Sequence, residues 1–306
     1  MGGAALVASS LPHRAAAAQN ASKPIGIQLY TVNDVLEKDP GGTLRQLKAI
    51  GYSEVELFSL VGETPKAFRS LLDAANLRCP SVHFPPKADF ELDEVFDTAH
   101  ALGARYVVAG MLYGYLHREE SKKPKSGSSS SSSTELLMDA NEAKREAEGA
   151  NRLGEQARRA GLQFAYHNHN FEFAPIGNGL SGFDVLLEET DPELVKFELD
   201  CGWATVGGKN PIDYFKRYPA RFPLVHVKDF LPQDPAAKPS PYQTRGHPGS
   251  ELGRGTIDYT PILAAAEAAG LKHAFAEQEG PYTRMNSIEA ARINFSYLRS
   301  VLEAGT

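Results

Sequence analysis

Eight short apolar segments that alternate with helical ones constrain the fold of this chain more than any other feature. We expect these segments to be strands over residues 25–30, 54–58, 78–84, 106–109, 162–167, 195–199, 224–227 and 274–277. Apolar spacing with glycine and proline punctuation predicts helices between them, over residues 41–50, 65–75, 92–102, 141–160, 183–189, 212–218, 259–269 and 287–302. This alternation within 306 residues is typical of an α/β protein built as one (β/α)8 barrel, the TIM barrel architecture.

A doubly wound open sheet is the alternative arrangement for such a pattern. That class carries a G-x-G-x-x-G turn after its first strand, and no such turn follows residues 25–30. An open sheet also binds its ligand at one switch point, whereas polar residues close many of the strands here. Both observations favour the barrel.

The chain is expected to form one catalytic domain over residues 23–306. Residues 1–22 precede it, and their Ala-rich stretch with A-x-A-like sites resembles the end of a secretory signal. We therefore expect an exported or periplasmic protein, with a cytoplasmic location and an inert leader as the alternative. The segment SKKPKSGSSSSSSTE, residues 121–135, is expected to be a flexible, inert insertion rather than the edge of a lid over the active site.

Composition excludes several classes of protein. The net charge of −6 argues against a nucleic-acid-binding surface, which needs a basic face. No run approaches the roughly 20 apolar residues of a membrane span. Cys79 and Cys201 are too few for a disulfide scaffold. The expected partner is a small molecule, and the sequence does not indicate an oligomeric state.

The last four strands end in side chains that bind metals or transfer protons. Their runs are FAYHNHNFEF, VKFELDCGW, PLVHVKDF and HAFAEQEG. Because side chains alternate along a strand, residues two apart share a face. The pairs that share a face in this way are His167 and His169, His226 and Lys228, and Glu277 and Glu279. Asp200, His226 and Glu277 then offer two carboxylates and one imidazole, which suit one divalent metal such as Mn²⁺, Co²⁺, Zn²⁺ or Mg²⁺.

Such a cation can polarise a sugar carbonyl and stabilise an enediolate, while spare carboxylates or histidines act as the base. The earlier strands add groups that suit sugar hydroxyls. These candidates for substrate binding are Gln28, Tyr30, Glu56 and His83, joined by His167 and by Trp203 as a stacking wall. A single polar residue at a strand end is more often structural than functional. The hypothesis of a sugar-binding site therefore rests on the joint placement of these residues.

The motifs IGIQLYTV, YSEVELF, YHNHNFEF, ELDCGW, HVKDF, LGRGTID and FAEQEG occur in the order typical of one group of barrels. Together they resemble the sugar phosphate isomerase/epimerase family, within the xylose isomerase-like TIM barrel superfamily that also contains endonuclease IV. The resemblance covers residues 24–302 and implies a carbohydrate substrate and one divalent metal. It implies Asp200, His226 and Glu277 as ligands, and Lys228 in a substrate-contacting or acid/base role.

The fourth ligand is open, because His167 stands where many members of that family have a glutamate. Either His167 or Glu172 can take the place. We favour Glu172, since a third carboxylate neutralises a divalent ion better and the family prefers one. His169 is then the preferred base, because an imidazole titrates near neutral pH, and Glu279 is a further catalytic candidate.

The first functional hypothesis is a metal-dependent sugar isomerase or epimerase that removes a proton next to a carbonyl. The alternative is a lyase or hydratase acting on keto-sugars or 3-keto-glycosides, which the expected export and the His-rich fifth strand favour. Both begin with the same enolisation. A non-catalytic sugar-binding barrel is a further alternative, and DNA repair, as in endonuclease IV, is opposed by the acidic charge.

Overall fold

Eight parallel strands form a closed barrel in the structure, a computed structural model that describes residues 23–84, 91–110, 112, 139–232, 248–280, 282 and 284–304. Around the barrel the order is β1, β12, β9, β8, β5, β4, β3 and β2. Their bounds are β1 Gly26–Gln28, β2 Glu54–Leu57, β3 Arg78–His83, β4 Tyr106–Gly110, β5 Gln163–His167, β8 Val195–Asp200, β9 Leu224–Val227 and β12 His273–Ala276. The prediction of a (β/α)8 barrel is confirmed.

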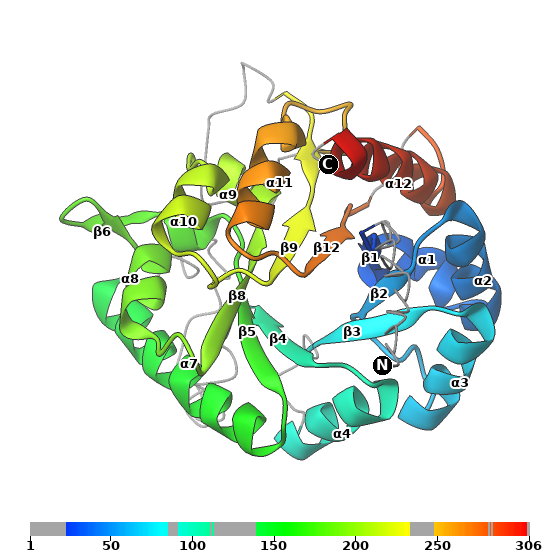
Figure 1. The fold of residues 1–306 in the computed structure, drawn as a ribbon, viewed down its shortest axis with the longest axis horizontal. Helices are drawn as coiled ribbons and strands as arrows, with labels where there is room; N and C mark the ends of the chain where they lie inside the picture. The colour runs from blue at the N-terminus through cyan, green and yellow to red at the C-terminus, as the bar shows by residue number, and fades with distance from the viewer. Residues whose placement is uncertain are drawn as a thin grey trace, which may run out of the picture.

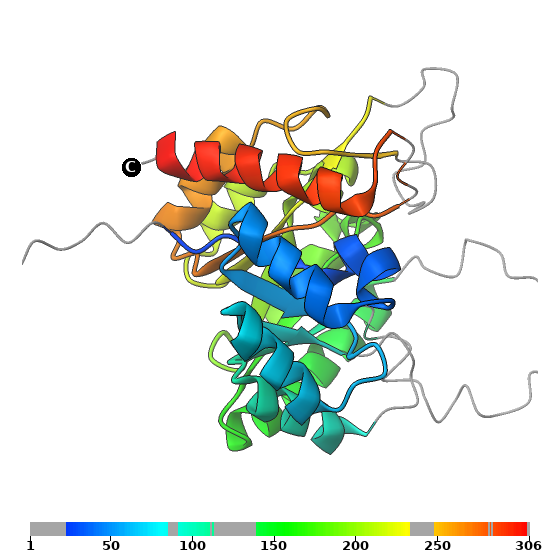
Figure 2. The same cartoon turned by 90° about the vertical axis from the view of Figure 1, so that its right-hand side faces the viewer.

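Helices surround the strands in a ring (Figure 1). The main ones are α2 Pro40–Ile50, α3 Pro65–Ala75, α4 Leu92–Leu102, α7 Ala140–Arg159, α8 Gly182–Glu189, α10 Pro211–Arg217, α11 Tyr259–Ala268 and α12 Ser287–Ala304. Figure 2 shows α12, α2 and α3 side by side on the outside of the barrel. Each of these helices was expected from the sequence within two residues at either end, because capping residues and apolar spacing are local signals.

Short elements that the sequence pattern did not predict lie mostly at the carboxyl ends of strands. The first strand stops at Gln28, whose side chain accepts a hydrogen bond from Tyr30 N and so starts a 3-10 turn. Asp200 likewise caps a helix through Trp203 N. The additional elements are η1 Leu29–Val32, α1 Asn33–Leu36, η3 Phe171–Phe173, α9 Cys201–Val206, the pair β6 Pro175–Gly177 and β7 Leu180–Ser181, and the pair β10 Asp229–Phe230 and β11 Gly249–Ser250.

Alternation along the strands divides the core into two layers. Val225 and Val227 of β9 belong to the large cluster that packs between strands and helices. Leu224, on the other face of β9, belongs to a small cluster with Phe275 of β12 that fills the barrel interior. A Cβ on Gly26 would lie 2.3 Å from the Phe275 ring, so glycine is needed there. His226 shares its face with Leu224 and therefore points into the barrel.

Asp229 explains why the HVKDF and LGRGTID motifs occur together. Its carboxylate accepts backbone N–H bonds from Phe230 and from four residues of the later segment. The four are Gly253, Gly255, Thr256 and Ile257. This single side chain fixes the path of the loop between β11 and α11 beside the strand that carries His226 and Lys228.

The proposed leader, residues 1–22, and the Ser-rich insertion, residues 121–135, lie outside the described residues. Within the described part of the chain, no helix is both long and apolar enough to cross a membrane.

Candidate metal-binding active site

Polar side chains converge on the inner face of the barrel at the carboxyl ends of its strands. Register places His167 opposite Glu198, and Asp200 opposite His226, on neighbouring strands. Seven of these side chains are at least nine-tenths buried: Glu56, His167, Glu198, Asp200, His226, Lys228 and Glu277. Their burial next to one another, away from the helices, marks this end of the barrel as the candidate site.

The upper group joins Asp200, His226 and Glu277 to Lys228. Glu277 Oε2 lies 3.0 Å from His226 Nδ1 and 2.7 Å from Lys228 Nζ. Lys228 Nζ also lies 2.7 Å from Glu279 Oε1 and 3.5 Å from Asp200 Oδ2. Potential ligand atoms of Asp200, His226 and Glu277 all lie within 4.8 Å of one another. The structure therefore brings together the three ligands that were predicted, with Lys228 beside them.

The charges of this group determine its protonation. Burial alone would lower the pKa of Lys228, but the carboxylates of Glu277, Glu279 and Asp200 raise it above its ordinary value. Burial would raise the pKa of Glu277, but the charges of Lys228 and His226 hold it well below its usual range. Burial raises the pKa of Asp200 to about 6. At neutral pH the group holds a lysine ammonium among carboxylates.

A second group lies one layer deeper and includes Glu198, which was missed from the sequence. Three imidazole nitrogens surround Glu198 Oε2: His83 Nε2 at 2.9 Å, His167 Nδ1 at 3.1 Å and His226 Nε2 at 3.2 Å. Glu198 is two residues before Asp200 and therefore shares its face. The alternation that singled out His226 with Lys228 applies equally to these two acids, so the signal was present in the run ELD.

Glu56 and Gln28 lie next to this deeper group. Glu56 is fully buried and accepts hydrogen bonds from Gln28 and Ser81 while also lying against His83 and His226. The amide of Gln28 is occupied at both ends, by Glu56 and by Tyr30 N. The geometry gives no support to direct substrate binding by Gln28 or Glu56.

Glu172, the predicted fourth metal ligand, is not brought into either group. It is fully buried, and its carboxylate accepts hydrogen bonds from Tyr166 Oη at 3.0 Å and from His169 N at 2.9 Å. Burial raises its pKa to about 8. Glu172 follows β5 in a 3-10 turn that points it toward the outer residue Tyr166, so the geometry supports a structural role in holding the His169 segment.

His169 lies above the upper group, next to aromatic rings. Its ring stacks on Phe171 at a centroid distance of 5.7 Å, and its Nδ1 atom is buried without a hydrogen bond. Burial and the charge of Lys228 lower its pKa to about 3. The expectation that this imidazole titrates near neutral pH is wrong, and the ring is uncharged at that pH.

Two aromatic residues expected to contact a sugar differ in exposure. Tyr30 is 41% exposed and packs edge-on against Phe58 with the ring centroids 4.8 Å apart. Trp203 is buried, with its ring 4.7 Å from Phe230 and 5.0 Å below the Lys228 ammonium. Tyr30 keeps a face open to a ligand, whereas Trp203 forms the floor beneath Lys228.

The barrel, its order of motifs and its site agree with one known family. Residues 44–301 match the model of the xylose isomerase-like TIM barrel family. This chain belongs to that family. An inosose dehydratase of Lacticaseibacillus casei is 27% identical over 272 residues, which span 81% of this chain and 84% of that protein.

Solved structures of the xylose isomerase-like barrel superpose over almost the whole chain. A sugar phosphate isomerase/epimerase of Parabacteroides distasonis is 24% identical, with a TM-score of 0.69 over 95% of this chain and 98% of that one. A xylose isomerase-like TIM barrel protein of Mycobacterium smegmatis, solved in complex with magnesium, is 18% identical, with a TM-score of 0.64 over 93% and 98%. At these identities the two structures establish the shared fold.

The residues at the carboxyl end of this xylose isomerase-like barrel fit a divalent metal. Asp200 Oδ2 and Glu198 Oε1 are buried and accept no hydrogen bond, although Asp200 has the more distant Lys228 as an ion pair. Buried carboxylate oxygens without donors are costly unless a cation or a proton compensates them. The combination of carboxylate and imidazole donors suits Zn²⁺, Mn²⁺ or Co²⁺.

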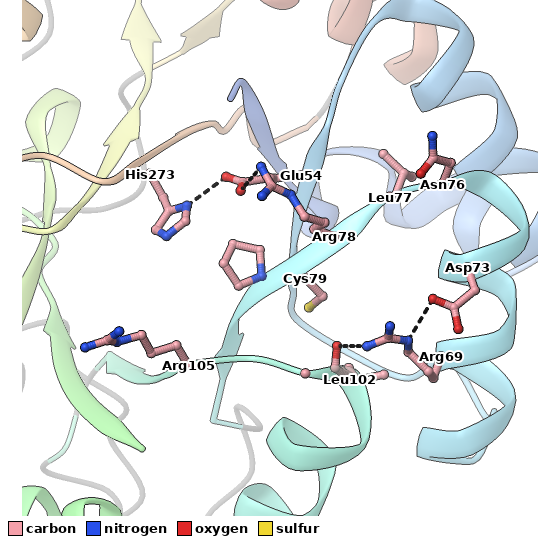
Figure 3. A pocket seen from close by; sticks show the side chains of 12 residues that line it. Glu54, Arg69, Asp73, Asn76, Leu77, Arg78, Cys79, Leu102, Arg105 and His273 are labelled. Atoms are coloured by element: carbon pink, nitrogen blue, oxygen red, sulfur yellow. Dashed lines mark hydrogen bonds and ion pairs between the residues drawn. The ribbon is translucent and has the colours of Figure 1, made fainter. Parts of the chain in front are cut away.

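A separate pocket of about 520 Å³ lies at the opposite, amino-terminal end of the barrel. Figure 3 shows the buried Glu54 between Arg78 and His273 in this pocket. These residues occupy the first positions of β2, β3 and β12. Catalytic groups of such barrels lie at the other end, so the convergence of ionisable groups locates the candidate site better than the size of a cavity does.

Proposed function

We propose that this protein is a divalent-metal-dependent lyase that removes water from a keto-sugar or a related cyclic keto-polyol. The observation that carries the proposal is the buried Asp200, His226 and Glu277 group with Lys228 against it. It supplies a cation site and a fixed ammonium at the point where a carbonyl compound would bind. The similarity to inosose dehydratase favours elimination as the outcome.

In this proposal Asp200, His226 and Glu277 hold the metal, which when bound supplies a Lewis acid for the substrate carbonyl. Lys228 donates a hydrogen bond to a substrate oxygen. Two candidate bases flank it. His169 follows β5, and Glu279 follows β12, where it is 44% exposed and paired with Lys228. Glu279 is the better base of the two, because its exposed carboxylate lies beside Lys228, whereas the His169 ring stacks on Phe171.

Isomerisation or epimerisation is the second candidate function, because it begins with the same proton removal. The same geometry that supports the lyase also supports this function, namely a cation site for the substrate carbonyl with a candidate base on each side. The two outcomes differ only in whether a hydroxyl group leaves from the next carbon.

The proposal is tested by incubating the metal-loaded protein in D₂O with a panel of inososes, keto-sugars and 3-keto-glycosides. Loss of water gives an unsaturated ketone, seen by NMR and by ultraviolet absorbance. Deuterium incorporation with no loss of water indicates the isomerase or epimerase. Asp200→Asn should abolish turnover, and His273→Gln, at the opposite end of the barrel, should preserve it. The absence of turnover and of deuterium exchange across the panel, with Mn²⁺, Co²⁺, Zn²⁺ and Mg²⁺ each tried in turn, would contradict the proposal.

A further inference from the structure

We propose that the deeper group is a second metal site, which binds Zn²⁺ through His83, His167, Glu198 and His226. These four residues present ligand atoms that all lie within 4.8 Å of one another. The site shares His226 with the proposed catalytic metal and otherwise consists of different residues. It comes from strands β3, β5, β8 and β9, so barrel closure alone assembles it.

The separations between the carboxylate oxygen and the three nitrogens are close to those of tetrahedral coordination. Zinc ligands at about 2.0–2.1 Å from the ion are separated from one another by about 3.3 Å in a tetrahedron. The three imidazole nitrogens lie 2.9, 3.1 and 3.2 Å from Glu198 Oε2. Movements of a few tenths of an ångström would bring these three separations to the tetrahedral value, and all four ligand atoms already lie within 4.8 Å of one another.

Hydrogen bonding leaves one oxygen of the buried Glu198 without a donor. The two lone pairs of Glu198 Oε2 are met by His83 Nε2 and His167 Nδ1, while His226 Nε2 lies 3.2 Å away and bonds Glu56. The second oxygen, Glu198 Oε1, is buried and accepts no hydrogen bond. A cation in this place would compensate the charge of this buried carboxylate, and the carboxylates of Glu198 and Glu56 would together balance its two charges.

The ring of His226 can serve both sites because its nitrogens point in different directions, provided that it loses its remaining N–H proton and bridges the two ions as an imidazolate. Its Nδ1 atom faces Glu277 in the upper group, and its Nε2 atom faces Glu198 and Glu56 in the deeper one. Three imidazoles and one carboxylate favour Zn²⁺ or Co²⁺ over Mg²⁺. His83, whose side chain is 12% exposed, is the least buried of the four.

Metal content tests the proposal without an activity assay. The full chain is stripped with a chelator, dialysed against Zn²⁺ and measured by inductively coupled plasma mass spectrometry. We expect two ions in the wild type and one in His83→Gln and in the isosteric Glu198→Gln. The control His273→Gln changes a partly buried histidine that pairs with the buried Glu54 at the other end of the barrel, and it should keep two ions. Thermal unfolding checks that each variant is folded.

The pattern of losses separates this proposal from the proposed function. Suppose that the wild type binds a single ion. If that ion is lost in Asp200→Asn but kept in His83→Gln and Glu198→Gln, the deeper site alone is overturned. One ion that is kept in Asp200→Asn but lost in His83→Gln and Glu198→Gln overturns the upper site and supports the deeper one. No bound zinc in the wild type overturns the deeper site, while the upper site is then judged by the turnover test with Mn²⁺, Co²⁺ and Mg²⁺. With Co²⁺, the strong visible absorption of a four-coordinate ion should disappear in His83→Gln.

Discussion

Lys228 is the residue on which the charge balance of the site depends. It is 2% exposed and lies against Glu277, Glu279 and Asp200. A buried ion pair adds little net stability compared with an apolar pair, but removing one partner leaves an uncompensated buried charge. The main effect of the Lys228 ammonium is therefore to keep the neighbouring carboxylates ionised, rather than to add net stability to the barrel.

Lys228→Met should lower the free energy of unfolding of the metal-free protein by about 3–5 kcal/mol, because it strands the carboxylate of Glu277. Urea unfolding measures this loss. Added Zn²⁺ should restore part of it by replacing the missing positive charge. A variant as stable as the wild type without metal would show that Glu277 is protonated rather than paired with Lys228.

The two candidate bases can be separated by isosteric changes. Glu279→Gln should slow solvent deuterium exchange into the substrate by at least about 100-fold, a typical loss for a general base. His169→Asn should reduce exchange less, because the half-buried imidazole is stacked on Phe171. Both variants should keep the metal content of the wild type. The reverse order of the two effects would assign the base to His169.

At the scale of elements, a chain of buried acids joins α7 to β5 and to the turn after it. Tyr166 Oη lies 3.4 Å from Glu146 of α7 and 3.0 Å from Glu172. Small residues let the helix approach. A Cβ on Gly154 would lie 2.6 Å from the carbonyl oxygen of Leu194. The hydrogen bonds of Tyr166 to Glu146 and Glu172 then link α7 to the segment that holds His169.

Glu146 should make stability fall as pH rises. Burial raises its pKa from 4.5 to about 7 in the folded protein. The folded state therefore binds the proton more tightly, and this contribution is full below about pH 4.5 and is lost as pH rises through 7. The advantage of Glu146→Gln over the wild type should grow between pH 5 and pH 8 in thermal unfolding. The exposed Glu148→Gln on the same helix is the control, and a constant difference for Glu146→Gln would contradict this assignment.

Gly202 lets α9 start close to β9. A Cβ there would lie 2.6 Å from Lys228 O and 2.9 Å from Lys228 Cβ. Gly202→Ala should displace the turn that Asp200 caps and weaken metal binding about tenfold or more, as changes behind metal ligands do. Calorimetric titration with Zn²⁺ measures this effect. At Gly280 a Cβ would have an ordinary contact of 3.7 Å, so Gly280→Ala should bind metal normally. Equal affinities in the two variants would refute the close packing.

At the scale of the whole molecule, the barrel is closed by its first and last strands. Strand β1, which starts at Gly26, pairs with β12, which ends at Ala276, and also with β2. We predict that deleting residues 1–22, the proposed leader, leaves the folded domain intact, because all eight barrel strands begin after it. Circular dichroism and thermal unfolding should match those of the full chain within about 2 °C. An insoluble product would mean that these residues belong to the domain. We also propose that they direct export, which cell fractionation of the full chain would test.

The sequence by itself determined the local elements and which polar residues share a face. The end of a helix at glycine and the alternation of side chains along a strand depend only on neighbours within a few residues. The strands near Asp200, His226 and Glu277 could therefore be predicted from the sequence. The same rule could have identified Glu198, since it shares the face of Asp200.

Only the tertiary structure decided which faces meet and in what charge state. Closure of the barrel brings Glu56 and His83, on β2 and β3, against His226 on β9. The turn after β5 directs Glu172 to Tyr166 instead of to Asp200, His226 and Glu277. Burial beside Lys228 keeps His169 uncharged. These outcomes depend on contacts between residues far apart in the chain and on loss of solvent, and neither can be obtained from a local pattern.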